Sequence, residues 1–309
     1  MNRILIIRGG AIGDFILTLP ALKALRDAYP DARIEILGYE HIAALARNRF
    51  YADAARSIEY AALSGFFAKG GTLDPVLSDY FASFDLVISY LFDPDGIFQA
   101  NLQRSGVKKM VCGAAQIAAG SHAADQLAQP IKELGIRFNH CAARIFPSEE
   151  DRQYARDFLA GLASPIFALH AGSGSARKNW PLDHWIRLGD HLLGQNAGAS
   201  VLIVSGEADE IQRTTLENRW RDRGGRFATN IQLPYLAAIL AGCVFIGHDS
   251  GISHLAAAAG AKCLLLFGPT DPAVWAPQGE NVRILHAPDN DLSQLTPEAV
   301  FEKIGEEKW

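Results

Sequence analysis

Three stretches of the sequence place small residues and a charged side chain where an apolar run ends. The first is Gly-Gly-Ala-Ile-Gly-Asp at residues 9–14, which follows the apolar residues 4–7 and Arg8. Glycines between a strand and a helix let the backbone approach a ligand, and the helix N-terminus favours a negative group. Asp14 could act there as a general base that takes a proton from an attacking hydroxyl. Capping of the helix would explain it equally well.

This first turn lacks the features of two common nucleotide-binding loops. Its glycines, Gly13 included, do not follow the G-x-G-x-x-G spacing of a dinucleotide-binding loop, and no acidic residue clearly ends the next predicted strand. It is not a P-loop either, because no Gly-Lys-Ser/Thr follows. The sequence therefore indicates a ligand-binding turn of another kind.

The second stretch, residues 168–181, is a loop rich in Gly and Ser that carries two adjacent cations. Backbone N–H groups, hydroxyls and the ammonium of Lys178 are the donors that can hold a diphosphate. A diphosphate gains negative charge as a sugar leaves it, and Lys178 is the residue expected to stabilise that charge. The alternative interpretation is a solvated loop that happens to be basic.

The third stretch, residues 245–260, again leads from a predicted strand into a predicted helix. Asp249 or Ser250 can cap this helix, whose first N–H groups point at an anion. His254 falls in the first turn, where a side chain can reach the same anion. Capping alone would explain Asp249, but Asp, Ser, Gly and His together in one turn favour a binding role.

Two further turns carry weaker signals. Glu207 follows a predicted strand, and its carboxylate could accept hydrogen bonds from ribose hydroxyls, although a surface role explains it nearly as well. Residues 267–272, Phe-Gly-Pro-Thr-Asp-Pro, are most simply a rigid turn.

The elements that must position these residues alternate between strands and helices. This alternation indicates parallel βαβ units, whose ligands bind beyond the carboxyl ends of the strands, where the candidate residues stand. Buried strands are predicted at residues 4–7, 33–37, 86–90 and 108–112, and again at 166–170, 201–205, 243–247 and 262–267.

The length of 309 residues exceeds what one hydrophobic core usually serves. Residues 137–147 have little periodicity, and Pro147-Ser148-Glu149-Glu150 is typical of a helix start. We therefore predict two doubly wound, Rossmann-like α/β domains, residues 1–147 and 148–309, that face each other across a cleft. The last segment, about 296–309, is predicted to be a capped helix of the second domain that can pack back on the first.

Composition narrows the classes of function. The net charge of -5 leaves no excess of Lys and Arg to neutralise phosphates, which argues against a nucleic-acid partner. No apolar run approaches the roughly 20 residues that span a bilayer, and the N-terminal run is too short for a signal peptide. The cysteines form no C-x-x-C pair and have no His at metal-ligand spacing, which predicts reduced cysteines in a cytoplasmic protein. They are Cys112, Cys141, Cys243 and Cys263.

Taken together, the motifs resemble glycosyltransferase family 9, the heptosyltransferases that add heptose to the lipopolysaccharide inner core. They stand in the order and at the spacing of that family across nearly the whole chain. The Asp-Ser-Gly-x-x-His turn joined to Phe-Gly-Pro-Thr is quite specific. The matching motifs are Arg8-x4-Gly13-Asp14-x5-Pro20, Gly172-Ser173-x4-Lys178-x-Trp180-Pro181, Gly206-Glu207, Asp249-Ser250-Gly251-x2-His254-Leu255-Ala256 and Phe267-Gly268-Pro269-Thr270-Asp271-Pro272.

The resemblance implies a GT-B fold, in which the N-terminal domain binds the acceptor and the C-terminal domain binds the nucleotide sugar. It implies an inverting, metal-independent transfer with ADP-heptose as co-substrate and no cofactor. By this analogy Asp14, beside Gly13 on the acceptor side, is the base, Lys178 steadies the departing diphosphate, and Glu207 meets the ribose. The phosphate and sugar pocket would be lined by Gly172, Ser173, Asp249, Ser250, Gly251 and His254.

The resemblance also implies the partners. These are a nucleotide-sugar donor and a glycan or glycolipid acceptor such as lipopolysaccharide core. The resemblance also implies that the protein acts at the cytoplasmic face of the inner membrane, where it can associate loosely with the membrane. The sequence shows no amphipathic anchor. Residues 61–72 carry one cation, Lys69, although an acidic, phosphorylated acceptor calls for several. The donor sugar, the acceptor, the oligomeric state and the extent of domain closure stay open.

Three other functions compete with transfer. A nucleotide-sugar 2-epimerase shares the GT-B architecture but needs more acid/base groups around the sugar and no second substrate. A nicotinamide oxidoreductase would need the missing dinucleotide-binding spacing. A non-catalytic nucleotide-sugar binding protein would need Lys178 but hardly Asp14. The Asp-x-Asp spacing of a metal site occurs at Asp93-Pro94-Asp95, where the proline favours a turn. Transfer is therefore the favoured function.

Overall fold

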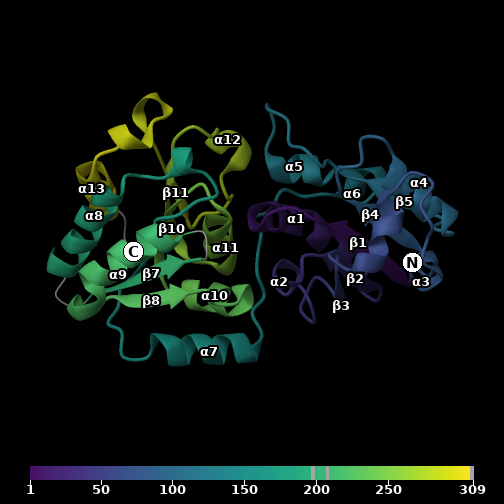
Figure 1. Ribbon diagram of the computed structural model, residues 1–309. Coiled ribbons are helices and arrows are strands. Elements are labelled where there is room, and N and C mark those ends of the chain that lie inside the picture. Colours follow the sequence, from purple (N-terminus) through teal and green to yellow (C-terminus); the bar gives the residue numbers. More distant parts are fainter. Residues whose placement is uncertain (196–198, 207–208, 307–309) are drawn as a thin grey trace. The chain divides into compact units, whose positions relative to one another are not determined.

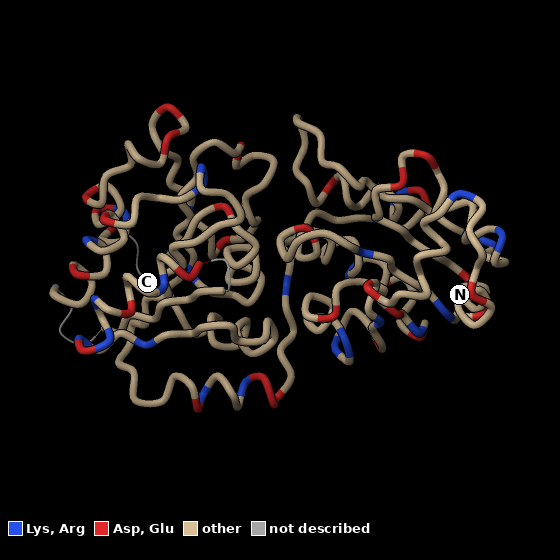
Figure 2. The backbone as a smooth tube through the Cα atoms, in the orientation of Figure 1, with Lys and Arg blue, Asp and Glu red and all other residues tan. Residues whose placement is uncertain are grey.

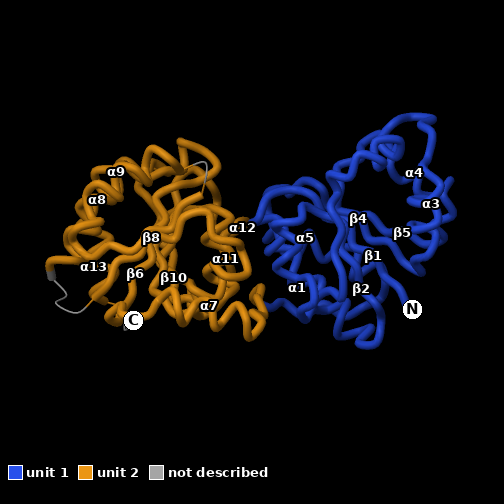
Figure 3. The backbone as a smooth tube through the Cα atoms, turned by 60° about the horizontal axis from the view of Figure 1, so that its bottom comes forward, with its two compact units in different colours: residues 1–141 blue, residues 142–309 orange. Residues whose placement is uncertain are grey.

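The computed structural model describes residues 1–195, 199–206 and 209–306 (Figure 1). The chain forms two compact units, Met1–Cys141 and Ala142–Trp309 (Figure 3). Each unit has its own all-parallel sheet and its own hydrophobic core. The predicted α/β class with two doubly wound domains is therefore confirmed.

Unit 1 is built on a five-stranded sheet in the order β3-β2-β1-β4-β5. The chain adds strands on one side of β1 and then, from β4, on the other side, so the strand order reverses between β1 and β4. Residues 4–7 of β1 are apolar and completely buried, as expected for a central parallel strand covered on both faces. The strands are β1 (Arg3–Arg8), β2 (Arg33–Gly38), β3 (Ala54–Ser57), β4 (Leu86–Ser89) and β5 (Met110–Cys112); the helical segments are α1 (Ile12–Ala28), α2 (Glu40–Ala43), η1 (Ala61–Phe67), α3 (Pro75–Ala82), α4 (Ile97–Arg104), α5 (Ala123–Leu127) and α6 (Gln129–Glu133).

Unit 2 repeats this plan with a six-stranded sheet in the order β11-β10-β9-β6-β7-β8, so its strand order reverses between β6 and β9. The strands are β6 (Ile166–His170), β7 (Ser200–Ser205), β8 (Arg226–Thr229), β9 (Val244–His248), β10 (Lys262–Phe267) and β11 (Val282–His286). The helical segments are α7 (Glu149–Leu159), η2 (Ala176–Lys178), α8 (Leu182–Gln195), α9 (Glu210–Trp220), η4 (Arg221–Arg223), α10 (Leu233–Leu240), α11 (Gly251–Ala259), α12 (Pro272–Trp275), η5 (Pro288–Asn290), η6 (Leu292–Gln294) and α13 (Pro297–Glu306).

The helix α1 begins directly after the glycine-rich turn. Pro20 suits a first turn, but the helix starts at Ile12 and Pro20 lies inside it. Proline has no N–H to bind the carbonyl of Ile16, so the helix continues through this point with one backbone bond fewer. This start is important for the site because it places Asp14 in the first turn of α1.

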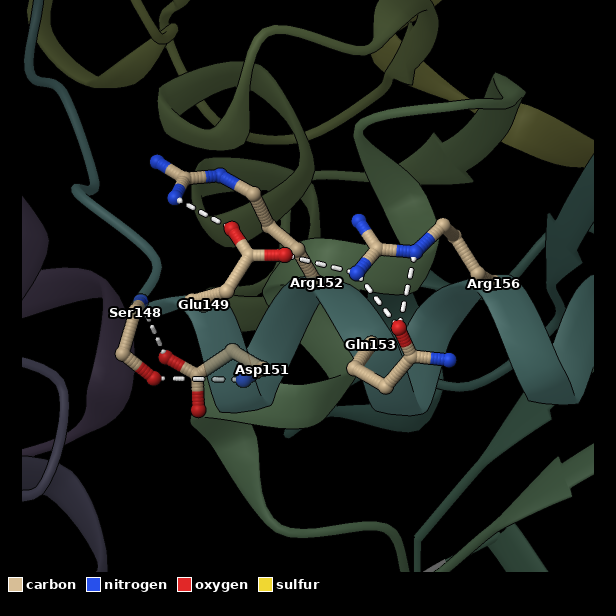
Figure 4. Close-up of polar contacts among 6 residues, drawn as sticks. All are labelled: Ser148, Glu149, Asp151, Arg152, Gln153 and Arg156. Atoms are coloured by element: carbon tan, nitrogen blue, oxygen red, sulfur yellow. Dashed lines mark hydrogen bonds and ion pairs between the residues drawn. The ribbon is translucent and has the colours of Figure 1, made fainter.

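Unit 2 begins a few residues before the predicted boundary after Pro147. The connecting segment already belongs to it, because the N–H of Ile145 donates to the carbonyl of Ala258 at 2.8 Å. Ser148 and Asp151 then form a capping box at the start of α7 (Figure 4). The Ser148 Oγ accepts the Asp151 N–H at 3.1 Å, and the Asp151 Oδ2 accepts the Ser148 N–H at 2.7 Å.

The helix α7 contains both acidic and basic residues (Figure 2), and Glu149, Arg152 and Arg156 are exposed. Arg156 lies 2.6 Å from a Glu149 carboxylate oxygen, and Arg152 lies 3.5 Å from the other oxygen (Figure 4). Exposed pairs of this kind add little stability, so α7 is held mainly by its cap and its packing on α10.

The last helix, α13, packs on α8. Phe301 stacks on His191 with 4.0 Å between ring centroids, and Val300 is buried in the core of unit 2. The sequence left open a return of this helix to the first domain; in the structure it belongs to unit 2.

Candidate active site

The sheet order of unit 2 brings the predicted donor loops together. β6 and β9 are neighbours without being consecutive, and His170 pairs in register with Gly247. The loops that follow these strands therefore leave the same edge of the sheet side by side, where the strand order reverses. β7 and β10 flank the pair, so the turns at Gly206 and Gly268 start from the same edge.

An ion pair joins the two central loops. Lys178 ends the η2 turn in the loop after β6, Asp249 follows β9, and the Lys178 Nζ lies 2.7 Å from the Asp249 Oδ2. The Asp249 side chain is 9% exposed and that of Lys178 is 31% exposed. A carboxylate that is nearly buried thus holds a cation that still reaches solvent. A bound diphosphate could share this ammonium with Asp249.

His248 connects the same loops, and sequence reasoning gave it no role. Its ring is fully buried, its Nε2 accepts the N–H of Trp180 at 2.8 Å, and its Nδ1 lies 3.5 Å from the carbonyl oxygen of Gly172. Because Nε2 accepts, the proton of the neutral ring is assigned to Nδ1. Burial, together with nearby His170, lowers the pKa of His248 to about 3. His248 therefore stays neutral at pH 7 and holds both ends of the Lys178 loop.

We expect unit 2 to lose stability in mild acid through His248. The unfolded chain binds this proton with a pKa of 6.5, whereas the folded chain binds it only near pH 3. The contribution of His248 to the free energy of unfolding is therefore complete above pH 6.5. It falls by about 1.4 kcal/mol for each pH unit below that value, until the pKa of the folded chain is reached.

Between pH 6.5 and 5, the free energy of unfolding of the non-titrating variant His248→Asn should fall less steeply than that of the wild type. The two slopes should differ by about 1.4 kcal/mol per pH unit. His170, whose pKa burial also lowers, titrates in both proteins. Urea unfolding followed by tryptophan fluorescence reports on unit 2 alone, because all five tryptophans belong to it. Equal slopes for the two proteins would contradict this role of His248.

Gly172 is required by a carboxylate that lies against it. A Cβ on Gly172 would stand 1.7 Å from the Asp209 Oδ1. Asp209 is 7% exposed, and its Oδ2 accepts the N–H of Gly206 at 2.8 Å, so it joins the loop after β6 to the turn after β7. Glu207, the predicted ribose contact in that turn, lies outside the described residues.

Replacing Gly172 with alanine is expected to weaken nucleoside diphosphate binding about tenfold or more, because the methyl group displaces either Asp209 or the loop. Isothermal titration with ADP measures the effect. Gly174→Ala is the matched control, since a Cβ there meets no atom within 4 Å. An unchanged Kd for Gly172→Ala would mean that this part of the loop does not shape the binding site.

Ser173 shapes the same loop from within. Its Oγ lies 2.7 Å from the Asn179 Oδ1 and 2.8 Å from the carbonyl oxygen of Ser175. The hydroxyl is therefore engaged in the loop's own turn, and a ligand would have to replace one of these bonds. The structure thus gives Ser173 a structural role beside the predicted ligand contact.

The N-terminus of α11 completes the arrangement. The Ser250 Oγ accepts the N–H of Ser253 at 3.3 Å and so caps the helix, and Gly251 is its first residue. The first N–H groups of a helix have no partner within it and favour an anion. His254 is 4% exposed, so it presents little surface to a ligand.

Thr270 is a residue whose possible contact the sequence did not reveal. Its Oγ1 is buried and has no hydrogen-bond partner among the described residues. It belongs to the turn after β10, the strand beside β9. A buried hydroxyl without a partner is costly, so this turn is a candidate ligand contact as well as a rigid turn.

In unit 1, Asp14 stands where the strand order reverses, just beyond β1. Its Oδ2 accepts the N–H of Ala11 at 3.0 Å, and its side chain is 37% exposed. The carboxylate therefore caps the helix and still reaches solvent, so the two predicted roles are compatible. Gly10 has a φ of +91°, and a Cβ there would lie 2.8 Å from the Asp14 Oδ2. Gly13, the predicted acceptor-side neighbour, is half-buried in the first turn of α1.

A buried arginine supports Asp14. The Arg8 guanidinium donates to the carbonyl of Asp14 at 3.0 Å and to the Thr18 Oγ1 at 3.1 Å, and it lies 3.9 Å from the Asp14 Oδ1. Burial lowers the pKa of Arg8, and the charge of Asp14 opposes that shift. Arg8 thus fixes the first turn of α1 and places a positive charge beside the candidate base. The sequence signalled it only as the first residue of a motif.

The described ranges contain no group of three or more His, Cys, Asp or Glu side chains that could hold a metal ion. Within the same ranges, no helix combines the length and the hydropathy needed to cross a membrane.

Comparison with known proteins gives one consistent result. The model of glycosyltransferase family 9 (heptosyltransferase) matches residues 119–304. Lipopolysaccharide heptosyltransferase 1 of Escherichia coli is 28% identical over 98% of this chain and 97% of its own length. Among solved structures, a family 9 glycosyl transferase of Veillonella parvula has a TM-score of 0.80 at 21% identity, covering 99% of this chain and 96% of that one. The Escherichia coli heptosyltransferase WaaC, solved with ADP, has a TM-score of 0.73 at 22% identity, covering 98% and 99%.

Proposed function

The chain belongs to glycosyltransferase family 9, and from this premise we propose that it transfers a heptose from ADP-heptose to a hydroxyl of a lipopolysaccharide-core acceptor. One observation carries the proposal. The Lys178–Asp249 pair and the N-terminus of α11 gather where the strand order of unit 2 reverses, and a diphosphate fits such a place. The relatives named lipopolysaccharide heptosyltransferases, which align over nearly the whole chain, supply the sugar and the acceptor class.

The proposed reaction is a single displacement at the anomeric carbon. The acceptor oxygen forms a bond to that carbon while its bond to the diphosphate oxygen breaks, and the bonding electron pair leaves with ADP. The hydroxyl proton passes to the Asp14 carboxylate. Attack from the face opposite the leaving group inverts the configuration. The exposed part of the Asp14 side chain supports this role, and the capping bond holds it in one orientation.

The departing diphosphate is proposed to be stabilised by groups of unit 2 without a metal ion. Lys178 supplies a full positive charge, and the N-terminus of α11 supplies oriented N–H groups. Gly172 and Ser173 would line the phosphates, and Glu207 would meet the ribose. Before the diphosphate binds, Lys178 and Asp249 neutralise each other, so neither charge is left without a partner.

The two domains have separate roles in this proposal. Unit 1, with Asp14, binds the acceptor, and unit 2 binds the nucleotide sugar. A 2-epimerase would use the same nucleotide-sugar site but no acceptor, and the family does not favour it. A non-catalytic binding protein would have no use for a positioned carboxylate such as Asp14.

Nucleotide preference tests the donor assignment. Isothermal titration with ADP, UDP, GDP and dTDP in the presence of EDTA is expected to show clear preference for ADP. Preference for another nucleotide would retain the transferase class and reject ADP-heptose. Binding that appears only after Mg²⁺ is added would reject the metal-independent mechanism.

A further inference from the structure

Unit 1 contains a pocket that the proposed mechanism does not use. Its volume is about 220 Å³, and it lies between the ends of β2 and β3 and the helical segments η1 and α3. Three leucines line it: Leu37 from β2, Leu63 from η1 and Leu77 from α3. Pockets for whole small molecules usually measure about 300–1,000 Å³, so this one has room for part of a ligand.

Two tyrosines complete the apolar lining. Tyr60 stands just before η1 and is 59% exposed, so its ring forms part of the rim. Tyr80 comes from α3, and its hydroxyl donates to the Glu35 Oε1 at 2.7 Å. The Tyr80 hydroxyl thus already has a buried hydrogen-bond partner, so a ligand in the pocket would contact the ring of Tyr80 and not its hydroxyl.

The one cation in the lining, Arg56, is already neutralised. Its Nε lies 3.2 Å from the Oε1 of Glu35, whose side chain is 7% exposed, and its guanidinium stacks over the Tyr80 ring at 4.3 Å. The same carboxylate therefore holds both Arg56 and Tyr80. An anion would have to compete with the buried Glu35 carboxylate for Arg56, whose side chain is 55% exposed, whereas the leucines and tyrosine rings offer a ligand mainly apolar surface.

The pocket lies at the same edge of the unit 1 sheet as Asp14, the proposed base that meets the acceptor hydroxyl. β1, β2 and β3 are neighbours in the sheet, and adjacent strands lie about 4.8 Å apart. The end of β3, at Ser57, is thus two strand spacings, about 10 Å, from the end of β1, which Asp14 follows. Both stand on the carboxyl edge of the sheet, where ligands of such folds bind. A group there would belong to a part of the acceptor removed from the reacting hydroxyl.

From this lining, size and position we infer that the pocket binds an uncharged hydrocarbon group of the acceptor, such as a segment of a glycolipid acyl chain. That the hydrocarbon belongs to an acceptor rests on the proposed function, whereas the binding of hydrocarbon by the pocket does not. The leucines and tyrosines remove the chain from water, and Glu35 competes with any anion for Arg56. This inference accounts for the scarcity of cations in residues 61–72, because their segment would contact an apolar part of the acceptor.

The first test uses n-octyl β-D-glucoside below its micelle concentration, with methyl β-D-glucoside as the matched ligand. Titration calorimetry should show the octyl compound binding at least about tenfold more tightly. Ser57→Phe, which fills the pocket, should abolish this difference. Val76→Phe adds the same ring at a position of α3 that is 75% exposed and outside the lining, and should preserve it. Equal binding of the two glucosides by the wild type, or no effect of Ser57→Phe, would overturn the inference.

The neutrality of the pocket is tested separately with octanoate. The wild type should bind octanoate no better than octyl glucoside. Glu35→Gln keeps an acceptor for Tyr80 but uncovers the charge of Arg56, so this variant should bind octanoate several-fold more tightly than the wild type does. Tighter octanoate binding by the wild type would show that the pocket selects an anion.

The source of the hydrocarbon is distinguished in the transfer reaction. Ser57→Phe should raise the KM for an acylated glycolipid acceptor at least several-fold and leave the KM for its deacylated form unchanged. No effect on either acceptor would assign the pocket to a free amphiphile, and an equal rise in both KM values would show that the substitution disturbs a part of the acceptor site common to both; either result would reject the assignment to the acyl chain. ADP titration reports on unit 2 separately: failure of the wild type to bind ADP would reject the donor proposal and not the pocket, and unchanged ADP binding by the variants would show that they keep the fold.

Discussion

Replacing Asp14 with asparagine should lower the rate of sugar transfer by about a hundred- to ten-thousandfold and leave ADP binding within about twofold of the wild type. The amide oxygen of asparagine can still accept the N–H of Ala11, so the first turn of α1 is preserved. The amide cannot take a proton from the acceptor hydroxyl. The loss should therefore appear in kcat and not in the Kd for ADP.

The chain offers a matched control for this substitution. Asp74 caps α3 by accepting the N–H of Leu77 at 2.9 Å, and it has no proposed part in the reaction. Asp74→Asn should keep nearly full activity. Similar losses in the two variants would show that Asp14 acts as a cap and that the base is another group.

Replacing Lys178 with methionine should lower kcat by about a hundred- to a thousandfold and weaken ADP binding about tenfold or more, because the charge that develops on the diphosphate loses its counterion. Steady-state kinetics and calorimetry measure the two effects. Arg177→Met is the matched control, since it removes the adjacent cation, which is exposed and has no proposed contact. A comparable loss in Arg177→Met would assign the effect to the general positive charge of the loop.

The substitution at Lys178 has a second consequence that must be separated from the first. It leaves the Asp249 carboxylate without its partner, and that charge would repel a diphosphate. The double variant Lys178→Met/Asp249→Asn removes the repulsion. If the double variant regains activity, repulsion by Asp249 caused the loss; if it stays inactive, Lys178 stabilises the leaving group directly.

The central part of each sheet was predictable from sequence because buried parallel strands are apolar on both faces. Residues 4–7 and 262–267 are examples that the structure confirms as β1 and β10. The candidate turns were predictable for the same reason, since each small, polar segment stands directly after such a strand. Parallel topology then brings those turns to one edge, as it does for the loops after β6 and β9.

The edge strands β3, β8 and β11 were not predicted. Each is partly exposed and contains polar residues, as in Arg226–Thr229 and Val282–His286, so it lacks the apolar run that reveals a central strand. The start of α1 could not be read from Pro20 either, because proline is commonest in a first turn, whereas Pro20 lies inside this helix.

The supporting contacts of the site were also beyond the sequence. Arg8 and His248 act through partners that only the fold brings near, such as Trp180, which lies 68 positions from His248. The pair formed by Lys178 and Asp249 is separated by 71 positions, so each residue could be proposed but their contact could not. The pocket beside β3 depends on an edge strand that was missed.

Sugar transfer itself is the most direct test of the proposed function. Purified protein would be incubated with ADP-heptose and a heptose-free lipopolysaccharide-core glycolipid in EDTA, and the product examined by mass spectrometry and NMR. We expect an acceptor heavier by one heptose, an equal amount of ADP, and an anomeric configuration opposite to that of the donor. ADP-heptose that is consumed or epimerised without any gain of mass by the acceptor would contradict the proposed function.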